Sequence, residues 1–332
     1  MMEWNAEEAL ETIRHGGRFG KKRIMEAVYR SNAEVFRDWG YRLPSGRVAG
    51  LGDRDALLAR TEVRLRPFDV LAAPSRGRPP ETGCANADCV DVAEELLGAG
   101  FDPAVLNLAS RIRPCGGYDR GLGAQEESLC RVSTLSQSLY QFGDPKRKCV
   151  RDAGVPHRAD AYPLDIRFGG IHSPGVVFFR RNAREGYAFR EAPFACGVVT
   201  VAALSFREPN DFCADERGYM APGGGFTPEG DAVQLDKIRT IFRLALAHGH
   251  DAVVLGAFGC GVNRLPPDAV ADQFGRVLVE PEFENKFRAV VFAILEGPAT
   301  ARRPVEEQGK YAPFYEHFGR WAERVENRPR GR

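Results

Sequence analysis

The residues best suited to chemistry are three consecutive polar side chains, Gln125, Glu126 and Glu127. They open a segment with helical periodicity, and adjacent residues on a helix face different directions. One carboxylate can therefore point at a ligand while its neighbour braces the site. A carboxyl group held in a partly apolar cleft near a diphosphate suits the work of a general acid. The same pair also fits a first-turn acidic pair that only favours the helix dipole.

Two glycine-rich turns follow short apolar runs that predict buried strands. The first occupies residues 110–117 after the run AVLNLA, and the second occupies residues 259–263 after the run DAVVLGAF. Ligands of open α/β sheets bind beyond the carboxyl ends of the strands, where glycine lets backbone N–H groups approach a phosphate. Neither turn matches the standard dinucleotide or P-loop pattern. We expect the two loops to hold a diphosphate, unless the glycines only turn the chain.

Residues 107–135 read NLASRIRPCGGYDRGLGAQEESLCRVSTL, and this segment resembles the signature of the microbial-type poly(ADP-ribose) glycohydrolases. That signature is a run of three glycines, a short spacer and then Gln-Glu-Glu. The segment SPGVVF at 173–178 and the block HGHDAVVLGAFGCGV at 248–262 are similar to the same family and stand in the same order. The resemblance runs from about residue 60 to residue 296.

The resemblance implies a macrodomain-like fold, a three-layer α/β/α sandwich that binds ADP-ribose at the strand carboxyl ends. It implies a hydrolase that cleaves the ribose–ribose O-glycosidic bonds of poly(ADP-ribose), with Glu127 as the catalytic acid/base. Glu126 is implied to be the second carboxylate of the catalytic pair and, with Gln125, to hold ribose hydroxyls. The other residues implied to bind ADP-ribose are Ser110, Cys115, Gly116, Gly117, Gly259, Cys260, Gly261, Val262 and Asn263.

The implied reaction needs no metal and no redox cofactor. Its implied partners are ADP-ribose and poly(ADP-ribose) or ADP-ribosylated proteins, without a membrane and without DNA. The eight cysteines agree with a metal-free protein, because they are scattered and form no CxxC pair, whereas zinc sites usually show closely spaced pairs. We therefore interpret them as buried thiols.

Two positions depart from the family pattern. Cys115 stands in place of the first glycine, and Asn263 stands where the family usually has a phenylalanine that packs on the distal ribose. Both positions are expected beside the bond that is cleaved. Two alternatives to the polymer hydrolase therefore stay open. One is a hydrolase of mono-ADP-ribose on protein side chains, and the other is a reader that binds ADP-ribose without turnover.

The pattern of the whole chain predicts an α/β fold with a mixed, mostly parallel sheet, because predicted strands alternate with predicted helices. Helical periodicity covers residues 6–14, 21–38, 88–97, 124–140, 235–248 and 311–325, and strand-like runs cover residues 62–72, 104–109, 175–179, 197–204 and 251–256. Residues 283–295 are expected to begin as a helix and end as a strand, and residues 73–83 to be a loop. We expect an N-terminal helical accessory region at 1–60, a catalytic domain at 61–297 and a C-terminal helical tail at 298–332.

The composition is that of an ordinary globular protein of 332 residues, with 43% hydrophobic and 27% charged residues. Lys and Arg number 46 against 45 Asp and Glu, so the net charge of +1 gives no general attraction to nucleic acid or to an anionic membrane. No apolar stretch is long enough to predict a membrane span, and the first residues show no hydrophobic signal core. We therefore expect a cytoplasmic protein.

Overall fold

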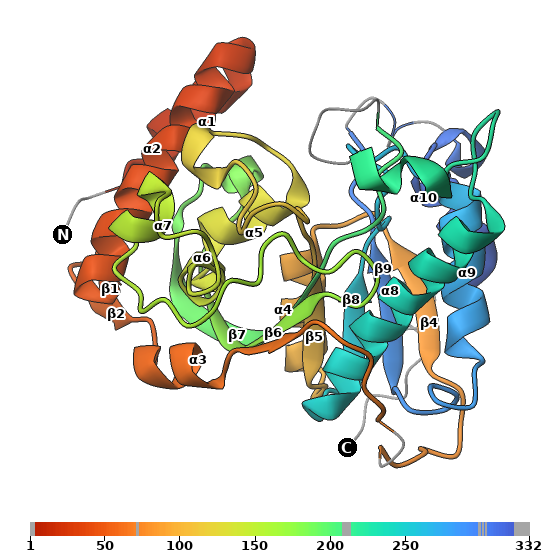
Figure 1. Cartoon of the computed structure of the whole chain (residues 1–332). Coiled ribbons are helices and arrows are strands. Elements are labelled where there is room, and N and C mark those ends of the chain that lie inside the picture. The colour runs from red at the N-terminus through yellow and green to blue at the C-terminus, as the bar shows by residue number, and fades with distance from the viewer. Residues whose placement is uncertain are drawn as a thin grey trace, which may run out of the picture. The chain divides into compact units, whose positions relative to one another are not determined.

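The computed structural model describes residues 4–70, 73–207, 214–297, 300, 302 and 304–321. The chain divides into two compact units, each with its own helices and strands (Figure 1). The first unit takes its residues from Met1–Val63, Ala109–Leu164 and Ser173–Val198. The second unit takes its residues from Arg64–Leu108, Asp165–His172 and Val199–Arg332.

The first unit begins with two helices that confirm the predictions over 6–14 and 21–38. Helix α1 begins after Asn5, whose side chain accepts a hydrogen bond from the N–H of Glu8, and it ends at Gly16. Helix α2 buries Val28, Val35 and other residues along one face. The elements of this unit are α1 (Ala6–His15), α2 (Gly17–Asp38), β1 (Gly40–Arg42), β2 (Val48–Gly50), α3 (Arg54–Arg60), η1 (Tyr118–Arg120), α5 (Gln125–Val132), α6 (Leu135–Tyr140), α7 (Lys148–Asp152), η2 (Ala183–Glu185) and most of β3 (Glu62–Arg64), β6 (Gly170–Arg180) and β7 (Phe189–Val201).

The second unit contains four parallel strands in the order β5-β8-β9-β4. Helix α4 packs against β5 and β8. Aromatic contacts connect α8 to α9 and α9 to β9. Phe274 of α9 lies 6.1 Å from Phe242 of α8 and 5.2 Å from Phe292 of β9 between ring centroids. The elements are β4 (Glu81–Ala85), α4 (Cys89–Gly98), β5 (Pro103–Leu108), η3 (Ala214–Tyr219), α8 (Pro228–Ala247), β8 (Ala252–Leu255), α9 (Pro267–Leu278), β9 (Ala289–Ala293), η4 (Val305–Glu307) and α10 (Tyr311–Phe318).

The predicted fold class is confirmed. The chain has a mixed α/β fold with a seven-stranded, mostly parallel sheet flanked by helices. The strands β5, β8 and β9 are buried along almost their whole length, as the short apolar runs predicted. The proposed division at residues 60 and 297 stays a prediction.

The helix predicted over residues 124–140 is two helices, so that prediction is wrong at its centre. Ser133 is extended, with φ −145° and ψ 175°, and separates α5 from α6. The N–H of Thr134 donates to the carbonyl of Val177 at 3.0 Å, and its hydroxyl accepts from the N–H of Val177 at 3.0 Å. Ser133 and Thr134 thus pair with Phe178 and Val177 of strand β6, and this pairing interrupts the helix.

Three further predictions need correction. Of the strand expected over 62–72, only β3 (Glu62–Arg64) forms within 62–70, and residues 71 and 72 lie outside the described residues. The loop expected over 73–83 already contains the start of β4, which pairs with β9. The helical start expected at residue 283 is a series of turns. Phe283 and Phe287 are four residues apart, a spacing that is typical of one face of a helix. Here both rings pack against Phe242 without forming a helix, at 5.5 and 5.4 Å between centroids. Helix α9 was not predicted, and the expected helix over 311–325 is α10 in the part that the structure describes.

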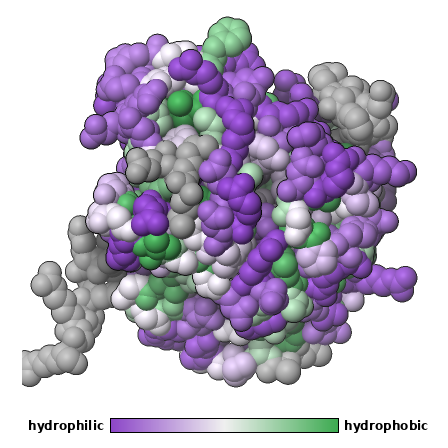
Figure 2. All heavy atoms as spheres, turned by 90° about the vertical axis from the view of Figure 1, so that its left-hand side faces the viewer, coloured by the Kyte–Doolittle hydropathy of each residue, from purple (hydrophilic) through white to green (hydrophobic). Residues whose placement is uncertain are grey.

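The surface that carries the first helices is mostly hydrophilic (Figure 2). Exposed hydrophobic side chains such as Phe19, which is 88% exposed, stand singly rather than in a broad patch. Single exposed hydrophobic residues are normal on a monomer and imply no docking surface. No helix among the described residues is long and apolar enough to cross a membrane.

Candidate active site

The loop before α5 is built from left-handed backbone conformations. Cys115, Gly116 and Gly121 have φ of 60°, 51° and 66°. Glycine adopts this region at no steric cost, whereas an L side chain such as that of Cys115 costs on the order of 1–2 kcal/mol. The N–H of Tyr118 donates to the carbonyl of Cys115 at 3.0 Å, which closes the turn. The loop consequently folds back over the first turn of α5, where Glu126 and Glu127 stand.

Glu126 braces this loop. It is 2% exposed, and its Oε2 accepts from the N–H of Ser110 at 2.8 Å. Its Oε1 accepts from the N–H of Cys115 at 3.1 Å. A carboxylate that accepts a backbone N–H on each oxygen holds both ends of the 110–115 segment in place. The structure therefore brings Ser110, Cys115 and Glu126 together, while the expected contact of Glu126 with a ribose hydroxyl stays a prediction.

Glu127 faces the glycines. Its Oε1 accepts from the N–H of Gly117 at 2.8 Å, and the residue is 6% exposed. Its Oε2 is buried and makes no hydrogen bond within the described part of the chain. A Cβ on Gly116 would lie 2.5 Å from Glu127 Oε1, so this carboxylate rests directly on the glycine backbone. The two glutamates thus differ: each oxygen of Glu126 accepts a hydrogen bond from a backbone N–H, whereas Oε2 of Glu127 has no hydrogen-bond partner among the described residues.

The side chain of Cys115 is buried away from solvent, at 1% exposure. Burial raises the pKa of its thiol well above the ordinary value, and a hydrogen bond with Cys130 raises it further. A thiol with a raised pKa is a poor nucleophile. Cys115 is therefore a packing residue at this position. Cys84, Cys130 and Cys149 are also buried thiols, as predicted.

Gln125 and Tyr162 complete the neighbourhood of the pair. Gln125 is the half-buried first residue of α5. Tyr162 was missed by the sequence analysis, because a single tyrosine in a polar segment gives no signal. Its hydroxyl is buried and makes no hydrogen bond with any described residue. Burial raises the pKa of Tyr162 well above its ordinary value, and the nearby charge of Glu126 adds to the effect.

The second glycine turn lies in the second unit and follows β8. Gly259 has φ 79°, and a Cβ there would meet Leu265 Cδ1 at 2.4 Å, so the close packing requires glycine. The N–H of Cys260 donates to the carbonyl of Ala257 at 3.0 Å, and burial raises the pKa of its thiol to about 12.

Beyond Cys260 the turn opens to solvent. Gly261 is exposed, Val262 is 59% exposed, and Asn263 is half-buried with its carbonyl accepting from the N–H of Phe206 at 2.8 Å. An exposed turn after a buried strand is a place where backbone N–H groups can reach a ligand. The binding role of these residues stays a prediction.

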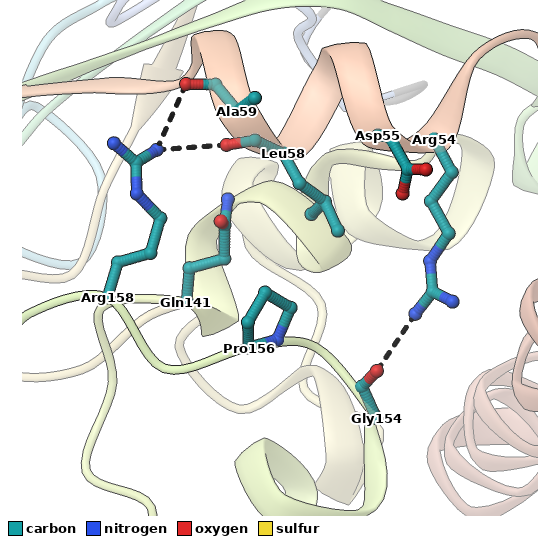
Figure 3. A pocket seen from close by; sticks show the side chains of 8 residues that line it. All are labelled: Arg54, Asp55, Leu58, Ala59, Gln141, Gly154, Pro156 and Arg158. Carbon is teal, nitrogen blue, oxygen red and sulfur yellow. Dashed lines mark hydrogen bonds between the residues drawn. The ribbon is translucent and has the colours of Figure 1, made fainter.

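A cavity of about 350 Å³ lies elsewhere in the first unit, between α3 and the loop after α7 (Figure 3). Arg54 donates to the carbonyl of Gly154 at 3.0 Å, and Arg158 donates to the carbonyls of Leu58 and Thr61 at 2.9 and 2.8 Å. Both guanidinium groups are thus committed to backbone carbonyls, and Arg158 caps the end of α3. None of the predicted site residues lines this cavity, so we interpret it as a structural junction.

The candidate site thus consists of two neighbouring carboxylates that accept hydrogen bonds from the backbone of the glycine turn. Across the part of the chain that the structure describes, no group of three His, Cys, Asp or Glu side chains is placed to hold a metal ion. Two neighbouring carboxylates beside a glycine turn, within a macrodomain-like α/β fold, agree with a hydrolase of the glycosidase type.

Comparisons with known proteins identify the type of glycosidase. Residues 30–181 match the family model described as the microbial-type PARG, catalytic domain. The crystal structure of poly(ADP-ribose) glycohydrolase from Thermomonospora curvata matches with 27% identity and a TM-score of 0.66, over 91% of this chain and 100% of that chain. The Deinococcus radiodurans enzyme in complex with ADP-ribose matches with 25% identity and a TM-score of 0.56, over 83% of this chain and 98% of that chain.

A further structure of the Thermomonospora curvata enzyme, bound to the inhibitor ADP-HPD, matches with a TM-score of 0.65. A search of curated proteins gave no significant match. The resemblance noted in the sequence is confirmed by the family model and by these structures. The chain is a PARG-like glycosidase.

Proposed function

We propose that this chain hydrolyses the ribose–ribose O-glycosidic bonds of poly(ADP-ribose) and releases ADP-ribose, with Glu127 as the general acid/base. Its similarity to the microbial-type PARG family supports this activity. The observation that carries the assignment is the environment of Glu127. One oxygen is fixed by the N–H of Gly117, and the other is buried without a described partner. An unsatisfied buried oxygen costs about 1–3 kcal/mol, which a proton or a substrate hydroxyl would relieve.

The proposed reaction uses Glu127 twice. As an acid it gives its proton to the oxygen that leaves the anomeric carbon, and the carbon–oxygen bond breaks to leave an oxocarbenium-like ribose. As a base the same carboxylate then takes a proton from a water molecule, whose oxygen bonds to the anomeric carbon. Glu126 contributes by holding Ser110 and Cys115, which fixes the loop in which Gly117 stands.

ADP-ribose is the proposed ligand of this chain. Relatives of known structure bind ADP-ribose and ADP-HPD. We propose that Gly116 and Gly117 of the first unit contact a ribose. As a separate proposal for the second unit, the backbone N–H groups of residues 259–263 donate to a phosphate. Poly(ADP-ribose) is the proposed substrate rather than mono-ADP-ribosylated protein, because the matching family model and the matching structures are those of poly(ADP-ribose) glycohydrolases.

The test compares the wild-type protein with Glu127→Gln and a charge-matched control, Glu95→Gln, at an exposed residue of α4. Each protein is incubated with free poly(ADP-ribose) and, separately, with mono-ADP-ribosylated proteins, and released ADP-ribose is measured by chromatography. We expect release from the polymer by wild type and by the control. Glu127→Gln is expected to lose turnover and to keep its ADP-ribose affinity within about threefold.

Other outcomes would contradict the proposal in different ways. Release only from mono-modified proteins would make the chain a mono-ADP-ribosyl-protein hydrolase. ADP-ribose binding without release from either substrate would make it a reader. A large loss of affinity in Glu127→Gln would show that this residue maintains the structure of the site rather than the reaction.

A further inference from the structure

One polar side chain in the interior of α2 connects the N-terminal helices to the loop around Glu127. Asn32 is 0% exposed and lies on the apolar face that also carries Val28 and Val35. Asparagine is a weak helix former, and burying its amide is costly unless both ends are hydrogen-bonded. Its position therefore requires specific partners.

Asn32 makes three hydrogen bonds that fix the orientation of its amide. Its Nδ2 donates to the hydroxyl of Tyr118 at 2.8 Å and to the carbonyl of Arg131 at 2.8 Å. Its Oδ1 accepts from Nε of Arg180 at 2.8 Å. Because a guanidinium can only donate, the oxygen must face Arg180 and the amide nitrogen must face the other two partners. We call this set of four residues, Asn32, Tyr118, Arg131 and Arg180, the Asn32 brace.

The partners of Asn32 stand on both sides of Glu127. Tyr118 directly follows Gly117, whose N–H holds Glu127 Oε1. Arg131 lies one turn after Glu127 on α5 and donates from its side chain to the carbonyl of Leu122, at the end of the same loop. The guanidinium of Arg131 also lies 5.8 Å from the centre of the Tyr118 ring. Loop and helix are therefore joined to each other and to α2.

Arg180, which donates to Oδ1 of Asn32, is itself held by further hydrogen bonds. Arg180 is 0% exposed and also donates to the hydroxyl of Ser31 at 2.7 Å and to the carbonyl of Tyr187 at 2.9 Å.

Helix α2 also packs closely against the loop that carries Tyr118 and Gly121. Tyr29 meets Tyr118 edge to face at 5.0 Å, and a Cβ on Gly121 would lie 2.9 Å from the carbonyl oxygen of Lys22.

We propose that Asn32 is a positioning residue for the reaction, through which α2 holds the N–H of Gly117 against Glu127. The proposal rests on the role proposed for Glu127. A misplacement of about 1 Å costs on the order of 100-fold in rate when it disturbs the geometry of the reacting groups. Loss of the Asn32 brace therefore acts mainly on kcat, because it moves the carboxylate without removing any group that contacts ADP-ribose.

The experiment uses the full chain with Asn32→Ala, Tyr118→Phe and Val35→Ala. Tyr118→Phe removes only the hydroxyl of Tyr118 that bonds to Asn32. Val35→Ala is the control, because Val35 is a buried apolar residue of the same helix that packs with Phe36 and Tyr41 and makes none of the hydrogen bonds of the Asn32 brace. We expect kcat on poly(ADP-ribose) to fall about 10- to 100-fold in Asn32→Ala and about 3- to 10-fold in Tyr118→Phe, with KM changed less than threefold. Val35→Ala is expected to lower the melting temperature and to leave kcat unchanged.

A second measurement keeps the proposal separate from the proposed function. Hydrogen exchange of the peptide over 111–123 is expected to be faster in Asn32→Ala than in Val35→Ala when both are compared at the same stability, since only the first frees the loop. Unchanged exchange in Asn32→Ala would overturn the brace, whether or not the wild type hydrolyses the polymer. Faster exchange with wild-type kcat would overturn its catalytic role. A wild type without activity on any ADP-ribose substrate would overturn the proposed function and, with it, the catalytic role of Asn32.

Discussion

A single methyl group at Gly116 would test whether the position of Glu127 limits the reaction. The Cβ of Gly116→Ala would lie 2.5 Å from Glu127 Oε1, 3.1 Å from its Cδ and 3.2 Å from Glu126 Oε2. The best separation of non-bonded carbon atoms is about 3.5–4.0 Å, so the Glu127 carboxylate must move by on the order of 0.5–1 Å. The φ of 51° adds backbone strain of about 1–2 kcal/mol.

The expected loss of activity follows from that displacement. A shift approaching 1 Å at a reacting group lowers the rate about 100-fold, which equals about 2.7 kcal/mol of activation free energy. Strain and overpacking together cost on the order of 2–4 kcal/mol of the free energy of unfolding. Because a domain of this kind has about 5–15 kcal/mol in total, the variant should stay folded at 25 °C.

The assay compares kcat on poly(ADP-ribose) and the urea midpoint of wild type, Gly116→Ala and the matched control Gly154→Ala. Gly154 has φ 63° in the same unit, and no atom lies within 4 Å of the place its Cβ would take. The control therefore has the same backbone strain without the contact, and it should lose stability but no activity. Wild-type kcat in Gly116→Ala would refute the reasoning, because the predicted displacement of Glu127 would then not matter to catalysis.

Two further predictions concern stability. Cys115→Gly removes the strain of a side chain at φ 60°, which stabilises the fold, and removes a buried thiol that bonds to Cys130, which destabilises it. Because the two effects oppose each other, we expect the free energy of unfolding to change by less than about 1 kcal/mol. A loss above about 3 kcal/mol in urea denaturation would contradict this balance. Burial acts to raise the pKa of Asp231, but hydrogen bonds from Arg276 and Gln273 outweigh it and hold this pKa below the ordinary value. The resulting stabilisation is present above the unfolded pKa and disappears as the pH falls through the folded one, so Asp231→Asn should destabilise at pH 7 and much less at pH 3. An equal loss at both pH values would show that the charge of Asp231 contributes nothing.

The elements with strong local patterns were predictable from the sequence. The runs at 104–109 and 251–256 became β5 and β8, and the amphipathic segment at 235–248 became the second half of α8. Each of these buries residues at its own periodicity, so no distant contact is needed to recognise it. The failures occurred where a distant strand decided the structure, as at Thr134, which bonds to Val177, and in β4, which pairs with β9.

The candidate site was predictable in composition but not in geometry. The resemblance to the family signature implied that Gly116, Gly117 and the glutamates belong to one site, and in the structure the N–H of Gly117 donates to Glu127. Which glutamate braces the loop depends on the directions of the N–H groups of Ser110 and Cys115. These directions follow from the path of the loop, including the left-handed φ of Cys115, which a sequence does not reveal. Asn32 was missed by the sequence analysis, although it stands among the apolar residues Val28 and Val35 of a segment that was predicted to be helical.

The contacts of Asn32 also bear on the meaning of the boundary predicted near residue 60. That boundary was inferred from proline, glycine and arginine in the loop that follows, and such residues show where the chain turns rather than where its packing ends. Without α2, the hydroxyl of Tyr118, the carbonyl of Arg131 and Nε of Arg180 would each lose a buried hydrogen bond. Each loss costs about 1–3 kcal/mol, and all three fall around the loop that holds Glu127. A protein without the N-terminal helices should therefore lose turnover even if its remaining strands still fold.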